Sequence, residues 1–206
     1  MMYRNIAVAA LCLALGACAA TTTTKPRPSA RVEVQESVGF TITETVSVSD
    51  SVRQDYERAV MLLEQGQTAQ GLTILEGVVE RAPDVSGPRI DLGVAMHRAG
   101  NLDAAEEHLL KALDLNPDHP VAHNELGIVY RKTGRFAEAR RSYEAALAIY
   151  PNYHYARRNL GVLCDLYLAD LDCALSSYEA YMATVPGDDQ AAMWIADLRI
   201  RTNRDD

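Results

Sequence analysis

The dipeptide Leu-Gly recurs at a fixed spacing of 34 residues, as Leu92-Gly93, Leu126-Gly127 and Leu160-Gly161. A repeat of this length is typical of a solenoid in which each unit is a pair of helices joined by a tight turn. One such pair cannot bury its apolar face alone, so consecutive pairs must stack and share a continuous core. The spacing therefore predicts an all-α chain built from stacked helix pairs.

The repeated unit contains further residues at fixed places. Residues 120–153 carry small, apolar and proline residues in the order Leu126, Gly127, Tyr130, Gly134, Phe136, Ala139, Tyr143, Ala146 and Pro151. Residues 86–119 repeat this order, from Leu92 to Pro117. The pattern resembles the signature of the tetratricopeptide repeat, whose helix-turn-helix units form a right-handed α-solenoid. In this arrangement a glycine on each first helix is expected to face an alanine on the second, as Gly127 would face Ala139.

Two less regular units flank this pair. Residues 52–85 form a degenerate first repeat, and residues 154–187 form a fourth repeat that needs one extra residue between its helices. After Pro186, apolar residues at helical spacing predict a capping helix within 188–206, which would cover the open end of the array. Trp194 in this helix is either part of the core or an anchor for a partner. The predicted array of four repeats (52–85, 86–119, 120–153 and 154–187) spans residues 51–187.

Residues 1–17 have the character of a signal peptide. Arg4 precedes an apolar run from Ile6 to Leu15, which is too short to span a bilayer. The run leads into Leu15-Gly16-Ala17-Cys18, which resembles the lipobox of bacterial lipoproteins. This resemblance implies cleavage before Cys18 and a covalent lipid on its thiol, whereas the alternative is an ordinary secretory signal. Ala19 is not the aspartate associated with inner-membrane retention, which implies the outer membrane and its periplasmic face.

Residues 18–50 are expected to form a tether followed by an extended segment. The run Thr21–Thr24 and the prolines after it make the first part too polar to bury. From residue 31 to 49, apolar and polar residues alternate, which is typical of a β-strand. Two possibilities remain open. The segment either lies on the domain or stays mobile, or it pairs as a strand with another chain or with a second copy.

Charge and motif content disfavour several classes of function. The chain has 28 acidic and 20 basic residues and a net charge of -8, which makes nucleic acid a poor partner. The five histidines do not follow a metal-ligand spacing. The sequence also lacks phosphate-binding glycine loops and nucleophile motifs. We therefore expect a binding protein that is not an enzyme, with no catalytic residue, no metal and no cofactor besides the lipid on Cys18.

Two cysteines, Cys164 and Cys173, remain after the predicted processing. They lie on either side of the turn in the fourth repeat, and an oxidising compartment would allow them to form a disulfide. Such a bond requires Cα atoms roughly 4.4–6.8 Å apart. The two interpretations are a disulfide and a pair of small buried apolar side chains.

In the tetratricopeptide repeat family, the first helices line a concave groove that receives a segment of a partner protein. By position, the resemblance assigns to this groove Tyr56, Val60, Ile90, Val94, His97, Arg98, Asn124, Ile128, Arg131, Lys132, Tyr155, Arg158, Asn159 and Val162. An apolar floor beside four cations suits a segment that mixes apolar and acidic residues. The alternative is a solvated basic face without a ligand.

The predicted function is that of a lipid-anchored adaptor that faces the periplasm and holds a protein partner for an envelope assembly. The identity of that partner stays open. A first alternative is a pilotin-like assembly factor for a type IV pilus or a secretion system. A second is an envelope element that associates with copies of itself, through the segment 32–48 or through the capping helix.

Overall fold

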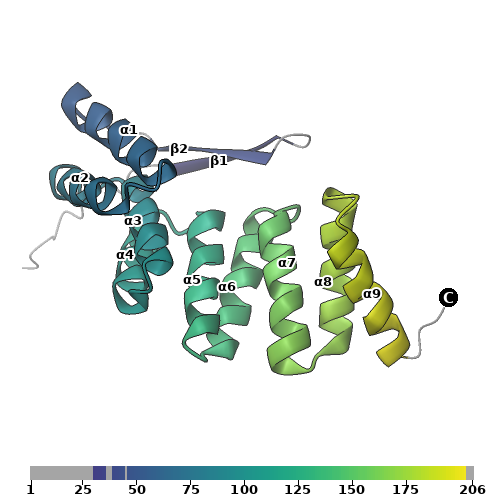
Figure 1. Ribbon diagram of the computed structural model, residues 1–206. Helices are drawn as coiled ribbons and strands as arrows, with labels where there is room; N and C mark the ends of the chain where they lie inside the picture. Colours follow the sequence, from purple (N-terminus) through teal and green to yellow (C-terminus); the bar gives the residue numbers. More distant parts are fainter. Residues whose placement is uncertain (1–29, 36–38, 45, 203–206) are drawn as a thin grey trace, which may run out of the picture.

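The computed structural model describes residues 30–35, 39–44 and 46–202 (Figure 1). The predicted signal peptide, Cys18 and the first part of the tether lie outside these residues. From Asp50 onwards, helices follow one another as antiparallel pairs that stack side by side (Figure 1). The predicted helical solenoid is therefore confirmed.

In the described residues the helices form four pairs and one terminal helix. The pairs are α1 (Asp50–Glu64) with α2 (Thr68–Arg81), α3 (Ser86–Arg98) with α4 (Leu102–Leu115), α5 (Pro120–Lys132) with α6 (Phe136–Ile149), and α7 (His154–Leu163) with α8 (Leu171–Thr184). A π-helical turn, η1 (Cys164–Leu168), extends α7, and the terminal helix α9 (Asp189–Arg201) packs against α8. No helix in this part of the chain has the length and apolar character that crossing a bilayer needs.

A β-hairpin precedes the array. Its strands β1 (Ala30–Gln35) and β2 (Gly39–Glu44) pair antiparallel, with Val32 opposite Ile42 and Val34 opposite Phe40. The alternating sequence therefore forms two short strands instead of one long strand. The strand partner lies within the same segment, so the described pairing requires neither another chain nor a second copy.

The seam inside each of the last three helix pairs is built on glycine. A Cβ atom added to Gly127 would lie 2.5 Å from a ring carbon of Tyr143, and one added to Gly161 would lie 2.6 Å from Tyr178. At Gly93 the nearest atom would be a Leu109 side-chain carbon at 2.7 Å. The expected alanine also lies close at Gly93, where the carbonyl oxygen of Ala105 would be 3.3 Å from the added Cβ. A large side chain, one helical turn beyond the alanine, lies directly against the glycine backbone.

The extra residue of the fourth repeat is absorbed in the turn between its helices. In the first three pairs the turn contains a glycine with positive φ, namely Gly66, Gly100 or Gly134. In the fourth pair η1 widens the end of the first helix, the N–H of Asp170 donates to the carbonyl of Cys164 at 2.9 Å, and Ala169 takes the positive φ of 52°. A left-handed alanine costs about 1–2 kcal/mol. This turn is therefore more strained than the other three.

His119 is a buried polar residue that caps α5. Its side chain is 8% exposed, and its Nδ1 accepts a hydrogen bond from the N–H of Ala122 at 3.3 Å. Pro120 follows in the first turn of the helix, where its missing N–H leaves no partner unpaired. Burial, with a smaller contribution from His123, lowers the pKa of His119 to about 4. The folded chain therefore holds this imidazole neutral at physiological pH.

Replacing Gly127 with alanine should lower the free energy of unfolding by about 1–3 kcal/mol, because the new Cβ would clash with the fully buried Tyr143 ring. Gly77→Ala is the matched control, since Gly77 is also helical but an added Cβ there would meet no atom within 4 Å. Alanine at this control position should raise the free energy of unfolding by about 0.5–1 kcal/mol. Urea denaturation followed by circular dichroism measures both variants. Equal effects at the two positions would contradict a tight seam.

The free energy of unfolding should depend on the protonation of His119. Its pKa is lower in the folded state than the ordinary value of 6.5, so the unfolded chain binds the proton first as the pH falls. The stability contributed by the neutral imidazole is complete above about pH 6.5 and is lost towards pH 4, by about 2–3 kcal/mol at pH 4.5. Asparagine keeps an N-cap acceptor without titrating. His119→Asn should therefore lose less stability than wild type between pH 7 and pH 4.5 in urea titrations, and an unchanged loss would refute this assignment.

Candidate partner-binding groove

The first helices of the repeats lie next to one another. Helices α1 and α3, α3 and α5, and α5 and α7 are in contact. Each presents a half-buried apolar residue at the same repeat position, namely Val60, Val94, Ile128 and Val162. Three of these, Val94, Ile128 and Val162, pack against the main core from outside. They form the predicted apolar floor, which we call the groove floor.

Polar contacts between neighbouring first helices run beside the groove floor. The hydroxyl of Tyr56 donates to Oδ2 of Asp91 at 2.6 Å, a contact between residues 35 positions apart. The amide nitrogen of Asn159 donates to Oδ1 of Asn124 at 2.9 Å, again across 35 positions. These bonds join α1 to α3 and α5 to α7 at equivalent repeat positions. Their first task is therefore to set the spacing of the first helices.

Two residues assigned to the groove are not available to a partner. Ile90 is 3% exposed and belongs to the main core, and Asn124 is 2% exposed. Placing them on the open surface was therefore wrong. The repeat position that they share points towards the next first helix, where a neighbouring repeat covers it. Tyr56, at the same position, is half-buried and bonded to Asp91.

The four predicted cations differ in their surroundings. Arg98 and Lys132 are exposed, whereas Arg131 and Arg158 are half-buried. Arg131 donates to the hydroxyl of Tyr167 at 3.3 Å, and its guanidinium carbon lies 5.6 Å from the centre of that ring. Arg158 lies over the ring of Trp194, 5.2 Å from its centre. Arg98 and Lys132 are thus the cations that a partner reaches first.

Two acidic side chains beneath the cations were not predicted as part of the site. Asp91 and Glu125 occupy the same position in successive repeats, and burial raises the pKa of both carboxyl groups. The charge of Arg98 opposes this rise at both. Their spacing of 34 residues was visible in the sequence, although nothing in the sequence indicated that burial would affect them.

His97 lies between these acids and the cations. Its Nδ1 is 3.8 Å from Oε2 of Glu125, and its side chain is 13% exposed. Burial lowers the pKa of His97, and the charges of Lys132, Arg98 and Arg131 lower it further. His97 is therefore a neutral polar group among cations at physiological pH.

A hollow opens between α1 and α3 at one end of the groove floor. Its volume is about 220 Å³, and its lining includes Val60 and Val94 of the groove floor together with Asp91 and Arg98. At the other end, Tyr155 on α7 is 59% exposed and forms an aromatic cluster with Tyr153 and His154. The groove thus offers apolar, aromatic and cationic surface along its length.

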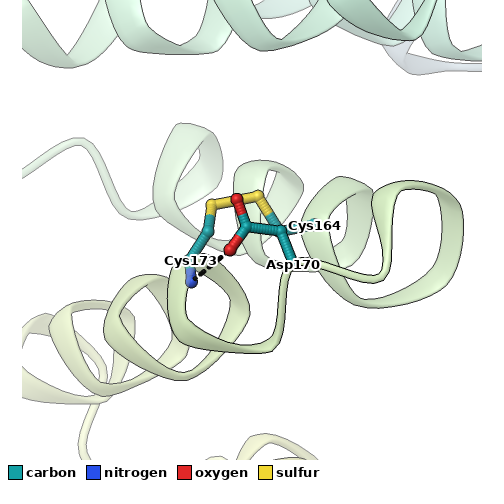
Figure 2. Close-up of side chains that lie close together, drawn as sticks. All are labelled: Cys164, Asp170 and Cys173. Carbon is teal, nitrogen blue, oxygen red and sulfur yellow. Dashed lines mark hydrogen bonds between the residues drawn. A yellow bond between two sulfur atoms is a disulfide. The ribbon is translucent and has the colours of Figure 1, made fainter.

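Cys164 and Cys173 form a disulfide, with Cα atoms 5.8 Å apart (Figure 2). Figure 2 also shows Asp170 beside the two sulfur atoms, and the three side chains bring ligand atoms within 4.8 Å of one another. Both sulfurs are bonded to each other, however, and Asp170 accepts from the N–H of Cys173 at 3.1 Å and pairs with Arg140 at 3.0 Å. The disulfide and the contacts of Asp170 therefore link η1 to α8, and these three side chains do not present free metal ligands.

Trp194 lies against the core of the array. Its ring centre is 5.1 Å from that of Tyr178, and Arg158 covers it. Ile195 packs against the same core. Of the two interpretations given above, the core position is confirmed.

Comparison with known proteins supports the repeat assignment. Residues 88–152 match the sequence model of the tetratricopeptide repeat family. No curated protein matches the chain by sequence.

Several solved structures share the fold. MamA from Desulfovibrio magneticus RS-1 has a TM-score of 0.67 at 20% identity, covering 77% of this chain and 89% of MamA. Pseudomonas aeruginosa PilF has a TM-score of 0.67 at 22% identity, covering 75% of this chain and 70% of PilF. A thermophilic tetratricopeptide repeat protein of Thermus thermophilus has a TM-score of 0.62 at 26% identity, covering 73% of this chain and 82% of that protein.

The stacked helix pairs agree with these matches. The helical array of this chain therefore has the fold of a tetratricopeptide-repeat solenoid, and residues 88–152 match the sequence model of that repeat family.

Proposed function

We propose that this protein is a lipid-anchored adaptor on the periplasmic face of the outer membrane, which holds a segment of a protein partner in its groove for the assembly of an envelope complex. The segment mixes apolar and acidic residues. Binding is the whole of its activity, because proteins with this repeat are generally scaffolds and not enzymes. The covalent lipid on Cys18 is its only expected prosthetic group.

The observation that carries this proposal is a difference in charge: the groove is bordered by cations, whereas the whole chain has a net negative charge. Four cations border the groove floor, while the chain as a whole has a net charge of -8. An acidic segment is therefore repelled by most of the surface and attracted to the groove, which steers its approach. Arg98 and Lys132 meet it first, since both are exposed.

The half-buried residues of the groove give the segment a place to bind. The valine and isoleucine side chains of the groove floor gain contact with apolar groups, at about 25 cal/mol for each Å² removed from water. Tyr155 adds an exposed aromatic ring, a residue type that frequently dominates binding energy at interfaces. Because the polar contacts between first helices already fix the groove shape, little order has to be gained on binding.

The anchor places this groove near the membrane. Acyl chains on Cys18 contribute about 0.8 kcal/mol for each buried methylene group, so two or three chains hold the protein firmly. The residues between Cys18 and α1 then limit how far the array lies from the lipid.

The pilotin-like function remains a second candidate. The likeness to PilF is one of fold at 22% identity, so it does not itself assign that function to this chain. Deletion of the protein distinguishes the two candidates, because a pilotin-like factor requires that secretin multimers disappear, whereas a general adaptor leaves them intact.

Reversing the exposed groove cations should abolish partner binding. A photo-crosslinker at Tyr155 should capture a discrete partner in cells, and adding Arg98→Glu and Lys132→Glu should remove that product, because the acidic segment would face repulsion costing several kcal/mol. Arg141→Glu is the matched control, as Arg141 is exposed on the second helix α6. Mass spectrometry identifies the crosslinked protein. An unchanged product in the double variant would rule out the groove as the docking surface.

Removing the lipid acceptor should release the protein from the membrane. The wild-type chain should partition with outer-membrane fractions, and Cys18→Ala should shift it away from lipidated material, because the thiol that carries the acyl chains is gone. Membrane fractionation with mass analysis of the N-terminal peptide measures this. An unmodified Cys18 in the wild-type chain would contradict the anchor while leaving the groove proposal intact.

A further inference from the structure

Helix α9 was expected to cap the array, which would require a polar outer face. Its outer face instead carries apolar residues. Met193 and Ile200 are each 65% exposed, and Ala192 and Ala196 are also exposed. These four residues lie on one stripe of the helix, opposite Ala191 and Leu198, which are buried against the array, and the exposed Asp189 begins the same stripe in the first turn. We call this stripe the α9 face. A terminal helix that only protects a solenoid end needs a polar outer surface, which the α9 face is not.

The repeat register explains what the α9 face is built to contact. Counting the extra residue of the fourth turn, Met193 is equivalent to Tyr56, Ile90, Asn124 and Arg158, and Ile200 is equivalent to Leu63, His97, Arg131 and Asp165. Members of both sets contact the next first helix or its extension. Asn124 bonds Asn159, Arg131 bonds Tyr167, and Asp165 pairs with Arg201 at 2.8 Å. Met193 and Ile200 therefore occupy the positions through which each earlier first helix contacts the first helix of the next repeat.

Ala196 occupies the glycine position of the seam. Its equivalents Gly93, Gly127 and Gly161 each receive a large side chain from the second helix of the same repeat. In the described chain α9 is the last helix, so no second helix covers Ala196, which is exposed. Within the described residues, the α9 face is thus an uncovered half of a helix pair.

A second copy of α9 fits this role. The second helices carry a small residue followed four positions later by a large one, as in Ala139 and Tyr143 or Ala174 and Tyr178, and α9 has the same spacing in Ala196 and Ile200. Ala196 therefore has two roles. It occupies the small-residue position of a first helix, and together with Ile200 it forms the small–large pair of a second helix. An interface related by two-fold symmetry needs this kind of self-complementary surface.

Antiparallel packing about Ala196 brings the apolar residues of the two copies together. With the two-fold axis near Ala196, Met193 of one copy meets Ile200 of the other, and the two small residues let the backbones approach. Arg199 and Arg201 remain paired within their own chain, with Glu179 at 2.9 Å and Asp165 at 2.8 Å, so apolar contact and not charge holds the two copies together. The opposed helix dipoles favour the same arrangement.

We propose that the protein forms a symmetric homodimer through the α9 face, with each α9 completing the helix pair of the other. This inference does not depend on the proposed function, because the α9 face is separate from the groove floor. A dimer joined at the ends of two arrays leaves both grooves open.

Disulfide trapping in cells tests the geometry. The full-length chain carrying Ala196→Cys should give a dimer on non-reducing gels, because the two introduced thiols meet near the symmetry axis. Ala148→Cys, at an exposed alanine on α6, should not. A product that joins the thiol introduced on α9 to a different protein, or no product at all, would overturn the proposal.

Native mass spectrometry of the detergent-solubilised full-length chain tests the energetics. Wild type should show a dimer, and Met193→Glu with Ile200→Glu should reduce the dimer fraction by about tenfold or more, since charged groups would face each other across the symmetry axis. Both positions are exposed, so circular dichroism should show an unchanged fold. Leu110→Glu, at an exposed apolar residue on α4, is the matched control and should stay dimeric. A monomeric wild type, or a double variant that stays dimeric, would refute the α9 face as the interface.

Discussion

In each of the last three helix pairs, the side chain of a second helix lies directly on the backbone of a first-helix glycine, and the array depends on this contact. Tyr143 on Gly127 and Tyr178 on Gly161 bring the two helices so close that a single methyl group would not fit. Each seam glycine is followed directly by a residue of the groove floor, as in Gly127 and Ile128. Close packing within the pair therefore also holds the groove floor in place.

The groove itself combines structural and binding tasks in the same residues. Tyr56, Asn159 and Arg158 contact the neighbouring repeat or the terminal helix while lying beside the groove floor. The half-buried carboxyl groups of Asp91 and Glu125 lie near Arg98, and burial raises the pKa of both, which favours their uncharged forms. A partner therefore meets a surface whose polar groups are already held in place, which favours selective binding over adaptation.

The repeat spacing was sufficient to predict the helix pairs, their order and the position of the fourth turn, because one periodic pattern specifies both the helices and their contacts. It could not separate groove residues from contacts between repeats. Ile90 and Val94 lie four positions apart on one helix, yet only the structure shows that the next repeat covers Ile90. The disulfide was one of two interpretations for the same reason, since the distance between Cys164 and Cys173 depends on the shape of a turn that departs from the repeat. The hairpin partner was missed because alternation indicates a strand but does not say where it reverses.

The π-helical turn η1 indicates what keeps the repeats in phase. One residue is added before α8, yet Tyr178 lies on Gly161 at 2.6 Å, nearly the same separation as Tyr143 on Gly127 at 2.5 Å, each measured to the Cβ that the glycine lacks. The contact between the two helices of a pair, and not the number of residues in the turn between them, therefore determines how the helices pack. A chain of this kind can lengthen at an inter-helix bend without disturbing the repeats beyond it, which makes such bends the natural places for new loops to arise as the protein diversifies.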